Sequence, residues 1–101
     1  MASNISTSLI ISTYNRSDAL ELCVKSVLRQ SLLPDEIIIA DDGSKEDTRE
    51  LIHQLAASSE VPIIHVWHED LGFRLASIRN KAIAKASKEY IIQIDGDIVL
   101  H

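Results

Sequence analysis

Residues 36–44 read Glu-Ile-Ile-Ile-Ala-Asp-Asp-Gly-Ser, an apolar run that ends abruptly in two acids and a glycine. A short apolar run bounded by turn-forming residues is typical of a strand that is buried on both faces. Three further apolar-centred stretches have the same form, at residues 8–13, 61–67 and 90–94, and polar or acidic residues follow each of them. The sequence therefore predicts four buried strands with polar loops at their carboxyl ends.

The segments between these strands carry apolar residues at the three- and four-residue spacing of a helix. In chain order these residues are Leu20, Val24, Val27 and Leu28, then Leu51, Ile52 and Leu55, then Leu75, Ile78, Ala82, Ile83 and Ala86. We expect Ser17 or Asp18 to cap the first helix and Ser44 or Asp47 to cap the second. Pro62 has no backbone N–H to donate, so we expect it at the start of its strand or on a sheet edge.

The alternation of apolar strands and helices favours an α/β fold. We expect a Rossmann-like, mostly parallel sheet with helices on both faces and right-handed crossovers. If the sheet grows outward from its first strand, the strand order is 3-2-1-4. A length of 101 residues suits one domain, so residues 1–101 are assigned to a single unit.

Composition excludes several classes of protein. The net charge is −5 and the isoelectric point about 5.2, so there is no basic field to bind nucleic acid or anionic lipid. A single cysteine rules out an internal disulfide framework and a multi-cysteine metal site. No signal peptide is visible, and no apolar run approaches the ~20 residues that a membrane-spanning helix needs. The expected location is cytoplasmic, at the inner face of the membrane if another part of a parent protein attaches there.

Polar residues gather where each predicted strand ends. They are residues 13–16 (Thr-Tyr-Asn-Arg), 41–44 (Asp-Asp-Gly-Ser), 68–74 (His-Glu-Asp-Leu-Gly-Phe-Arg) and 95–97 (Asp-Gly-Asp). Ligands bind at the carboxyl ends of the strands in open α/β sheets, so these clusters predict one binding site. Asp95 and Asp97, one residue apart, could flank a hard divalent cation with oxygen ligands.

Each cluster also has a purely structural interpretation. Residues 95–97 could form an Asp-Gly hairpin turn before the apolar residues 98–100, and residues 41–44 could be a turn that leads into a helix. Tyr14 and Asn15 could form a strand-to-helix turn, because Asn tolerates unusual φ values. Taken one at a time, these clusters leave both interpretations open.

Several single residues also have a structural interpretation. Arg79 and Asn80 fall on a predicted helix, where a solvated face is the usual explanation. Cys23 shares the apolar side of the first helix, so it is expected in the core. The four histidines show no metal-ligand spacing and are expected to be structural or at the surface: His53, His65, His68 and His101.

Taken together and in this order, the four motifs resemble the signature of family 2 glycosyltransferases. The resemblance covers roughly residues 6–100 and implies the amino-terminal, nucleotide-sugar-binding half of a GT-A fold. Residues 70–74 are similar to the subgroup that contains chondroitin-polymerase-type and other polysaccharide transferases. The chain departs from the pattern at Ser12, where Pro is usual, and at Lys81, where a small residue is often found.

The resemblance implies a site for the base of a UDP-sugar. The Thr-Tyr-Asn stretch holds the base in the family, so Thr13 and Tyr14 would cradle uracil, with Tyr14 stacking on it and Asn15 beside them. The first acid of the Asp-Asp-Gly-Ser motif accepts the base N–H, which assigns that role to Asp41, with Asp42 as its neighbour. A carboxylate only accepts hydrogen bonds, so it selects bases that present an N–H.

The resemblance also implies a site for the diphosphate and a metal ion. Arg79 and Arg16 would face the diphosphate, which a planar guanidinium can bind through two hydrogen bonds. Asp95 would contact the ribose or the sugar and share the metal with Asp97, which would hold Mg²⁺ or Mn²⁺. This cation would neutralise charge on the leaving nucleoside diphosphate.

The implied reaction is inverting transfer of a hexosyl or hexosaminyl group to a hydroxyl of a glycan or another acceptor. Family members carry the general base downstream of the Asp-Gly-Asp motif, so the base is expected beyond His101. We therefore interpret the chain as the donor half of a longer enzyme, inactive in transfer by itself. Residues 90–94 carry no charge and no Pro, so we expect a homodimer through this strand as an unprotected sheet edge.

Two other functional classes fit parts of the pattern. A phosphoacceptor receiver domain is also a doubly wound α/β unit, and residues 38–43 resemble its first strand with an acid pair. That strand would then have a whole β-α unit ahead of it, and the Lys that such domains carry after a later strand is absent here. A non-catalytic interaction module is the third interpretation.

Overall fold

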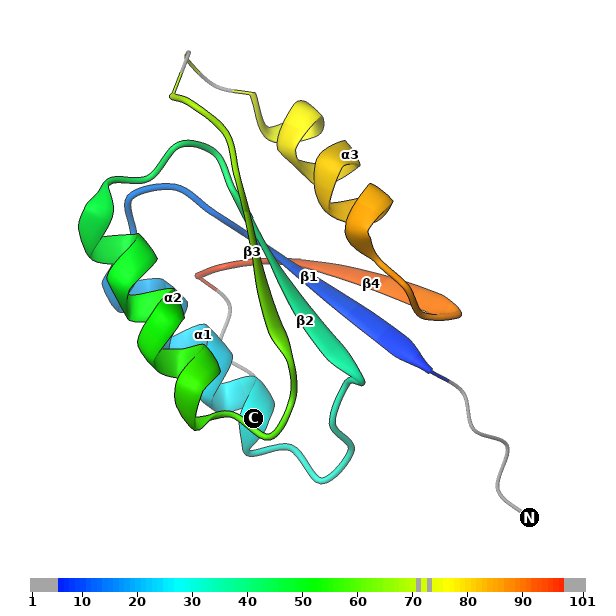
Figure 1. Ribbon diagram of the computed structural model, residues 1–101. Helices are drawn as coiled ribbons and strands as arrows, with labels where there is room; N and C mark the ends of the chain where they lie inside the picture. Colours follow the sequence, from blue (N-terminus) through cyan, green and yellow to red (C-terminus); the bar gives the residue numbers. More distant parts are fainter. Residues whose placement is uncertain (1–5, 71, 73, 98–101) are drawn as a thin grey trace.

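Four parallel strands form one sheet in the order β3-β2-β1-β4, which confirms the predicted strand order and the parallel arrangement. The structure is a computed structural model that describes residues 6–70, 72 and 74–97. Its elements are β1 (Thr7–Thr13), α1 (Ser17–Leu28), β2 (Glu36–Asp41), α2 (Glu46–Ser58), β3 (Ile63–Trp67), α3 (Leu75–Lys85) and β4 (Tyr90–Asp95). Helices α1 and α2 lie on one face of the sheet and α3 lies on the other (Figure 1).

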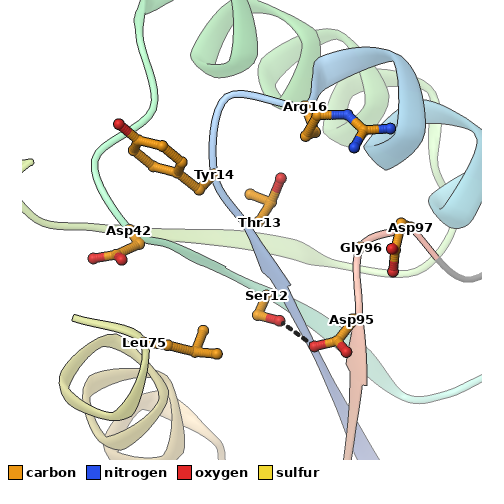
Figure 2. Close-up of a pocket in the computed structure, with 9 residues that line it drawn as sticks. All are labelled: Ser12, Thr13, Tyr14, Arg16, Asp42, Leu75, Asp95, Gly96 and Asp97. Atoms are coloured by element: carbon orange, nitrogen blue, oxygen red, sulfur yellow. Dashed lines mark hydrogen bonds between the residues drawn. The ribbon is translucent and has the colours of Figure 1, made fainter. Parts of the chain in front are cut away.

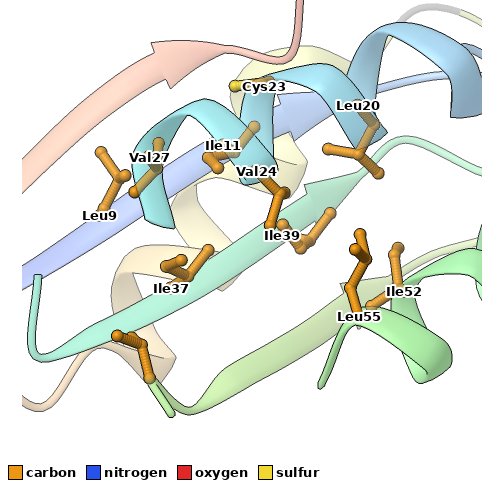
Figure 3. Packing of buried hydrophobic residues seen from close by; sticks show 11 residues of the cluster. Leu9, Ile11, Leu20, Cys23, Val24, Val27, Ile37, Ile39, Ile52 and Leu55 are labelled. Carbon is orange, nitrogen blue, oxygen red and sulfur yellow. The ribbon is translucent and has the colours of Figure 1, made fainter. Parts of the chain in front are cut away.

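Two hydrophobic cores follow from the alternation of side chains along β1 and β2. Leu9, Ile11, Ile37 and Ile39 pack against α1 and α2 (Figure 3). The residues between them in the strands pack on the opposite face, where α3 covers them: Ile10, Ile38 and Ala40, with Ile78 and Ala82 of the helix. Both faces of the central strands are therefore covered, which explains why their sequences are continuously apolar.

Cys23 is fully buried in the core between α1 and the sheet, as predicted. Burial, together with the charge of Asp97, raises the pKa of its thiol to about 11. A thiol in this state is not a nucleophile at neutral pH.

The amino end of β2 is held by a buried acid. The carboxylate of Glu36 accepts hydrogen bonds from the Ser8 hydroxyl (2.6 Å), the Ser87 backbone N–H (2.8 Å) and the Ser87 hydroxyl (3.1 Å). Burial by itself would raise the pKa of Glu36, but these hydrogen bonds lower it, and the net result is a lowered pKa. This cluster ties β1, β2 and the segment before β4 together at one end of the sheet.

The predicted helix caps are wrong. Helix α1 begins at Ser17 with Arg16 in the capping position, and α2 begins at Glu46 with Lys45 there; neither cap makes a side-chain hydrogen bond. The hydroxyl of Ser44 instead accepts the backbone N–H of Asn15 (2.8 Å), and the side-chain carbonyl of Asn15 accepts the N–H of Lys45 (2.9 Å). The loop after β1 therefore supplies a hydrogen-bond acceptor for the backbone N–H of Lys45, at the start of α2. The two segments lie about 30 residues apart in the sequence, so local sequence rules do not predict this contact.

Two further expectations concern single residues. Ile83 is 38% exposed, so its predicted place on the buried face of α3 is wrong. It follows Ala82 directly, and consecutive helical residues are turned by about 100°, which directs it away from the sheet. Pro62 lies just before β3, an edge strand, as predicted, and its carbonyl accepts the N–H of Ile37 (2.8 Å).

Candidate functional site

A pocket of about 200 Å³ opens where β1 and β4 end, and the loop after β2 forms part of its wall (Figure 2). Its lining residues are Ser12, Thr13, Tyr14, Arg16, Asp42, Leu75, Asp95, Gly96 and Asp97. Three of the four motifs that follow predicted strands therefore meet in one pocket. This convergence is the arrangement expected for a ligand site in an open α/β sheet.

The end of β4 is fixed by a close approach to β1. The N–H of Gly96 donates to the carbonyl of Ser12 (2.8 Å), and a Cβ at this glycine would lie 2.6 Å from the same oxygen. Only glycine fits there, so the Asp-Gly-Asp spacing places one carboxylate on each side of this contact. Gly96 and Asp97 form a turn, and residues 98–100, the second arm of the alternative hairpin, lie outside the described residues.

Asp95 and Asp97 have different surroundings. One oxygen of Asp95 accepts hydrogen bonds from the Ser12 hydroxyl (3.1 Å) and the Arg79 guanidinium (3.0 Å). Asp97 is exposed, and its side chain makes no hydrogen bond or ion pair with any described residue. The second oxygen of Asp95 and the whole carboxylate of Asp97 are therefore available to a ligand at the pocket.

The two carboxylates fit a hard divalent cation in part. Carboxylate oxygens are suitable ligands, and Mg²⁺ commonly uses one or two of them together with substrate phosphates and water. Among the residues that the structure describes, no group of three or more His, Cys, Asp or Glu side chains could hold a metal ion. A cation here would thus depend on oxygen atoms from a ligand or water as well as from the protein.

The two arginines of the predicted diphosphate site are placed differently. Arg16 lines the pocket, and its guanidinium lies 3.6 Å from the carboxylate of Asp18 at the surface. Arg79 does not line the pocket, but its ion pair with Asp95 brings it to the edge of the site. This ion pair also shows that Arg79 is more than part of a solvated helix face.

The adjacent acids Asp41 and Asp42 face different surroundings, because β2 ends at Asp41 and the chain bends at Asp42. Asp41 is fully buried and does not line the pocket; its oxygens accept the Ser44 N–H (2.9 Å) and contact His65 Nε2 (2.8 Å). Asp42 lines the pocket. Of the two acids, the pocket therefore receives the second, whereas the resemblance assigned the base contact to the first.

Asp42 is held on both of its oxygens. Oδ1 is hydrogen-bonded to Nε2 of the buried His68 (2.5 Å), and Oδ2 accepts the backbone N–H of Arg74 (2.9 Å). The loop between β3 and α3 supplies both partners. The pocket acid is thus ordered by a loop whose described residues do not line the pocket.

Two histidines at this end of the sheet support the acid pair, a role that the sequence did not reveal. The spacing of the histidines in the sequence is not that of metal ligands, so they were expected to be structural or at the surface. The signal lies in the strand pairing: β3 runs beside β2 with Ile39 opposite His65 and Asp41 opposite Trp67. That register brings His65 to Asp41, and the chain beyond β3 brings His68 to Asp42.

Tyr14 closes the pocket near Asp42 (Figure 2). Its hydroxyl donates to the carboxylate of Asp70 (2.7 Å), and this hydrogen bond, with desolvation and the charge of Asp70, raises the pKa of Tyr14. Gly43 permits this arrangement, since it has a φ of +94° and a Cβ there would lie 2.6 Å from the Asp70 backbone. The whole residue Tyr14 is 45% exposed and lines the pocket, so its aromatic ring is accessible to a ligand.

Thr13 and Asn15 flank Tyr14 but are used differently. The hydroxyl of Thr13 is buried and has no hydrogen-bond partner among the described residues, although Thr13 lines the pocket. Unpaired buried polar atoms are uncommon and often mark a place that a ligand or water completes. Asn15 does not line the pocket; its φ of 48° and its hydrogen bonds to Ser44 and Lys45 give it the turn role that was the alternative interpretation.

The family model described as "Glycosyl transferase family 2" matches residues 8–101. The chain belongs to glycosyl transferase family 2. The fold is of the GT-A type, and membership of this family removes the receiver-domain interpretation.

Curated relatives of this family 2 chain include enzymes of polysaccharide assembly. The chain is 34% identical over 92 residues to "Chondroitin synthase" of Escherichia coli, covering 90% of the chain and 13% of the relative. It is 36% identical over 97 residues to "Putative colanic acid biosynthesis glycosyl transferase WcaA" of Escherichia coli strain K12, covering 96% of the chain and 34% of the relative. The chain thus spans between about an eighth and a third of the length of these two proteins.

Solved structures share the fold of this family 2 chain. S. aureus TarS 1-349 superposes with a TM-score of 0.75 at 21% identity, over 94% of the chain and 28% of TarS 1-349. The same protein in complex with UDP superposes with a TM-score of 0.72 at 22% identity, over 92% of the chain and 28% of that structure. In the described part of the family 2 chain, no helix is both long and apolar enough to cross a membrane.

Proposed function

We propose that this chain binds the nucleotide of a UDP-sugar, with a divalent cation, as the donor-binding part of an inverting glycosyltransferase of polysaccharide assembly. The observation that carries the proposal is the single pocket in which the family motifs meet at the ends of β1, β2 and β4. The named activities of the relatives and the UDP complex of TarS support it.

The base of the nucleotide would lie between Tyr14 and Asp42. Tyr14 offers an aromatic face, and stacking of a base on such a face contributes ~1–3 kcal/mol. Asp42 takes the role of hydrogen-bond acceptor for the base N–H in place of Asp41, because Asp42 is the acid that lines the pocket. The unpaired hydroxyl of Thr13 would complete the polar contacts of the base.

The diphosphate and the cation would lie toward the end of β4. Asp97, free of protein partners among the described residues, and the free oxygen of Asp95 would hold Mg²⁺ or Mn²⁺. When bound, the cation neutralises charge that develops on the leaving diphosphate. Arg16 would contact the diphosphate directly, while Arg79 would hold Asp95 in place from the edge of the site.

Donor binding is the part of the reaction that the described residues support. A pocket of about 200 Å³ is smaller than the ~300–1,000 Å³ of typical small-molecule sites, so the sugar would extend beyond it. The acceptor hydroxyl would be a hydroxyl of a glycan, in keeping with the relatives' names. No residue described here is assigned as the general base, and the chain alone is expected to bind without transferring sugar.

Calorimetry with UDP, with and without Mn²⁺, tests the proposal. We expect the cation to tighten UDP binding to the unaltered chain and to have no effect on Asp97→Ala, which keeps a residual affinity for uridine. Glu60→Ala, at an exposed acid outside the pocket with no partner among the described residues, is the control and should respond to Mn²⁺ like the unaltered chain. Binding of UDP that Mn²⁺ does not change would reject the cation, and no binding of UDP would reject the proposed function.

A further inference from the structure

A line of three polar side chains leads from the pocket to α3, and it begins at Asp42. His68 Nε2 lies 2.5 Å from Asp42 Oδ1, and Lys81 Nζ lies 3.1 Å from Nδ1 on the other side of the same imidazole. Asp42 and His68 are buried, whereas Lys81 belongs to α3 and is exposed. A surface residue is thereby connected to the acid of the pocket through one buried ring.

The chemistry of the three groups determines where the hydrogens are. An ammonium group has three donors and no acceptor, so Lys81 donates to Nδ1 of His68. A ring nitrogen that accepts carries no hydrogen, which leaves the ring hydrogen on Nε2, facing Asp42. The imidazole therefore donates to the carboxylate: the acceptor-only carboxylate of Asp42 requires a hydrogen on Nε2, and the donor-only ammonium of Lys81 excludes one from Nδ1.

This tautomer keeps the carboxylate of Asp42 in a fixed orientation. Oδ1 accepts from His68 and Oδ2 accepts from the Arg74 N–H, so two donors define its plane. Each carboxylate oxygen has a second lone pair, and these remain for a ligand in the pocket that Asp42 lines. With the opposite tautomer, a bare Nε2 would face Oδ1, and two acceptors in contact would force the ring or the carboxylate to move.

We propose that His68 and Lys81 are positioning residues that hold Asp42 as the acceptor for the N–H of a uracil-type base. The inference rests on the proposed function, since it needs a nucleotide in this pocket. It assigns to Lys81, a residue that does not line the pocket, a part in recognising the base rather than the phosphates. Removal of the Lys81 amine should therefore weaken binding of the base selectively.

The test uses Lys81→Met, with Lys81→Arg as the conservative variant. Lys85→Met is the matched control: Lys85 lies on the same helix, is exposed, and makes no hydrogen bond or ion pair with any described residue. Nitrogen NMR of the chain labelled at histidine reports the tautomer of His68 without any ligand. Calorimetry with uridine, and separately with inorganic pyrophosphate and Mg²⁺, reports base and phosphate binding.

We expect Lys81→Met to lose the pure Nε2–H signature of His68 and to weaken uridine binding about 3- to 10-fold, with pyrophosphate binding unchanged. Lys81→Arg, which still donates, should behave like the unaltered chain, and so should Lys85→Met. The inference is overturned if Lys81→Met keeps the tautomer, or if uridine and pyrophosphate binding weaken equally. If the unaltered chain shows the Nε2–H tautomer but binds no uridine, the proposed function is wrong and so is the positioning role. That result would still confirm the hydrogen bonds that connect Asp42, His68 and Lys81.

Discussion

One buried acid lies at the amino end of β2 and another lies just past its carboxyl end, and the two acids have different roles. Glu36, at the amino end, is held by two hydroxyls and a backbone N–H, all neutral donors from Ser8 and Ser87. Asp42, just past the carboxyl end, is held by a histidine and a backbone N–H, and it lines a pocket. Burial is similar, at 5% and 3% exposure, so burial alone does not distinguish a structural acid from a binding acid.

The difference lies in what each carboxylate can still accept. Three donors on Glu36 come from segments that it fastens together, and its contribution is to the stability of the sheet. Asp42 keeps free lone pairs on the side of the pocket, next to an unpaired threonine hydroxyl and an open aromatic face. Substitutions at the two ends should therefore separate stability from binding.

The largest expected effect is on folding, at the amino end. Glu36→Ala should lower the free energy of unfolding by about 2–4 kcal/mol, because it leaves the buried Ser8 hydroxyl and the donors of Ser87 without their acceptor. Urea denaturation followed by circular dichroism measures this change. Glu60→Ala, at an exposed acid without a partner among the described residues, should change stability by less than about 0.5 kcal/mol. Equal effects of the two substitutions would contradict a structural role for Glu36.

The second prediction concerns binding, at the carboxyl end. Asp42→Asn should weaken uridine binding by about 1.5–3 kcal/mol, roughly 10- to 150-fold, because a charged acceptor for the base N–H is lost. Asp41→Asn is the comparison, since Asp41 is equally close in sequence but does not line the pocket. Calorimetry with uridine measures both variants. A larger loss from Asp41→Asn would return the base contact to the first acid of the motif.

These two adjacent acids show where sequence reasoning reaches its limit. The alternation of apolar strands and helices predicted a parallel sheet with helices on both faces, and the usual growth of a doubly wound sheet from its first strand predicted the strand order. The choice between Asp41 and Asp42 depends on where β2 stops and which way the chain then turns. The roles of His65 and His68 depend on the register between β2 and β3, which no spacing within either strand encodes.

At the site too, features that depend on nearby residues were predicted, whereas features that depend on contacts between distant segments were not. Tyr14 and the Asp-Gly-Asp motif were identified because each follows a strand end, and the structure brings both to one pocket. The cap of α2 was mispredicted because Asn15, from the loop after β1, bonds to Ser44 and Lys45 at the start of that helix. Local rules found the groups at the site but missed the contacts that connect its loops.

The third prediction concerns how the stability that Glu36 contributes depends on pH. The lowered pKa of Glu36 means that the folded chain binds a proton there less readily than the unfolded chain does. The ionised acid therefore stabilises the fold at a pH above about 4.5, the pKa of this group in the unfolded chain. This contribution should be lost as the pH falls below that value and through the lowered pKa. Stability measured at pH 3–7 for the unaltered chain and for Glu36→Gln should converge toward acid pH. A constant difference across the range would show that ionisation of Glu36 does not contribute.

The smallest expected effect involves the outer strand β4. Tyr90, Ile91 and Ile92 are 54%, 42% and 50% exposed, and β4 is an edge of the described sheet. An edge with free backbone groups and apolar side chains favours pairing with a second copy, so we expect a weak homodimer at high concentration. Sedimentation over a concentration series should detect it, and Ile91→Lys should abolish it while Leu22→Lys, at an exposed position of α1, should not. A chain that remains monomeric throughout would exclude this dimer.

The bond between Asn15 and the start of α2 has a consequence for the entropy of binding. Asn15 accepts from Lys45 and donates to Ser44, and the Ser17 hydroxyl donates to Asp47, so the loops after β1 and β2 are joined before any ligand arrives. Ordering of these loops is therefore a cost of folding, and a ligand that binds between them should lose little additional conformational freedom. Breaking this link with Asn15→Ala would transfer that cost to the binding step, where it would appear as a less favourable entropy at nearly constant enthalpy.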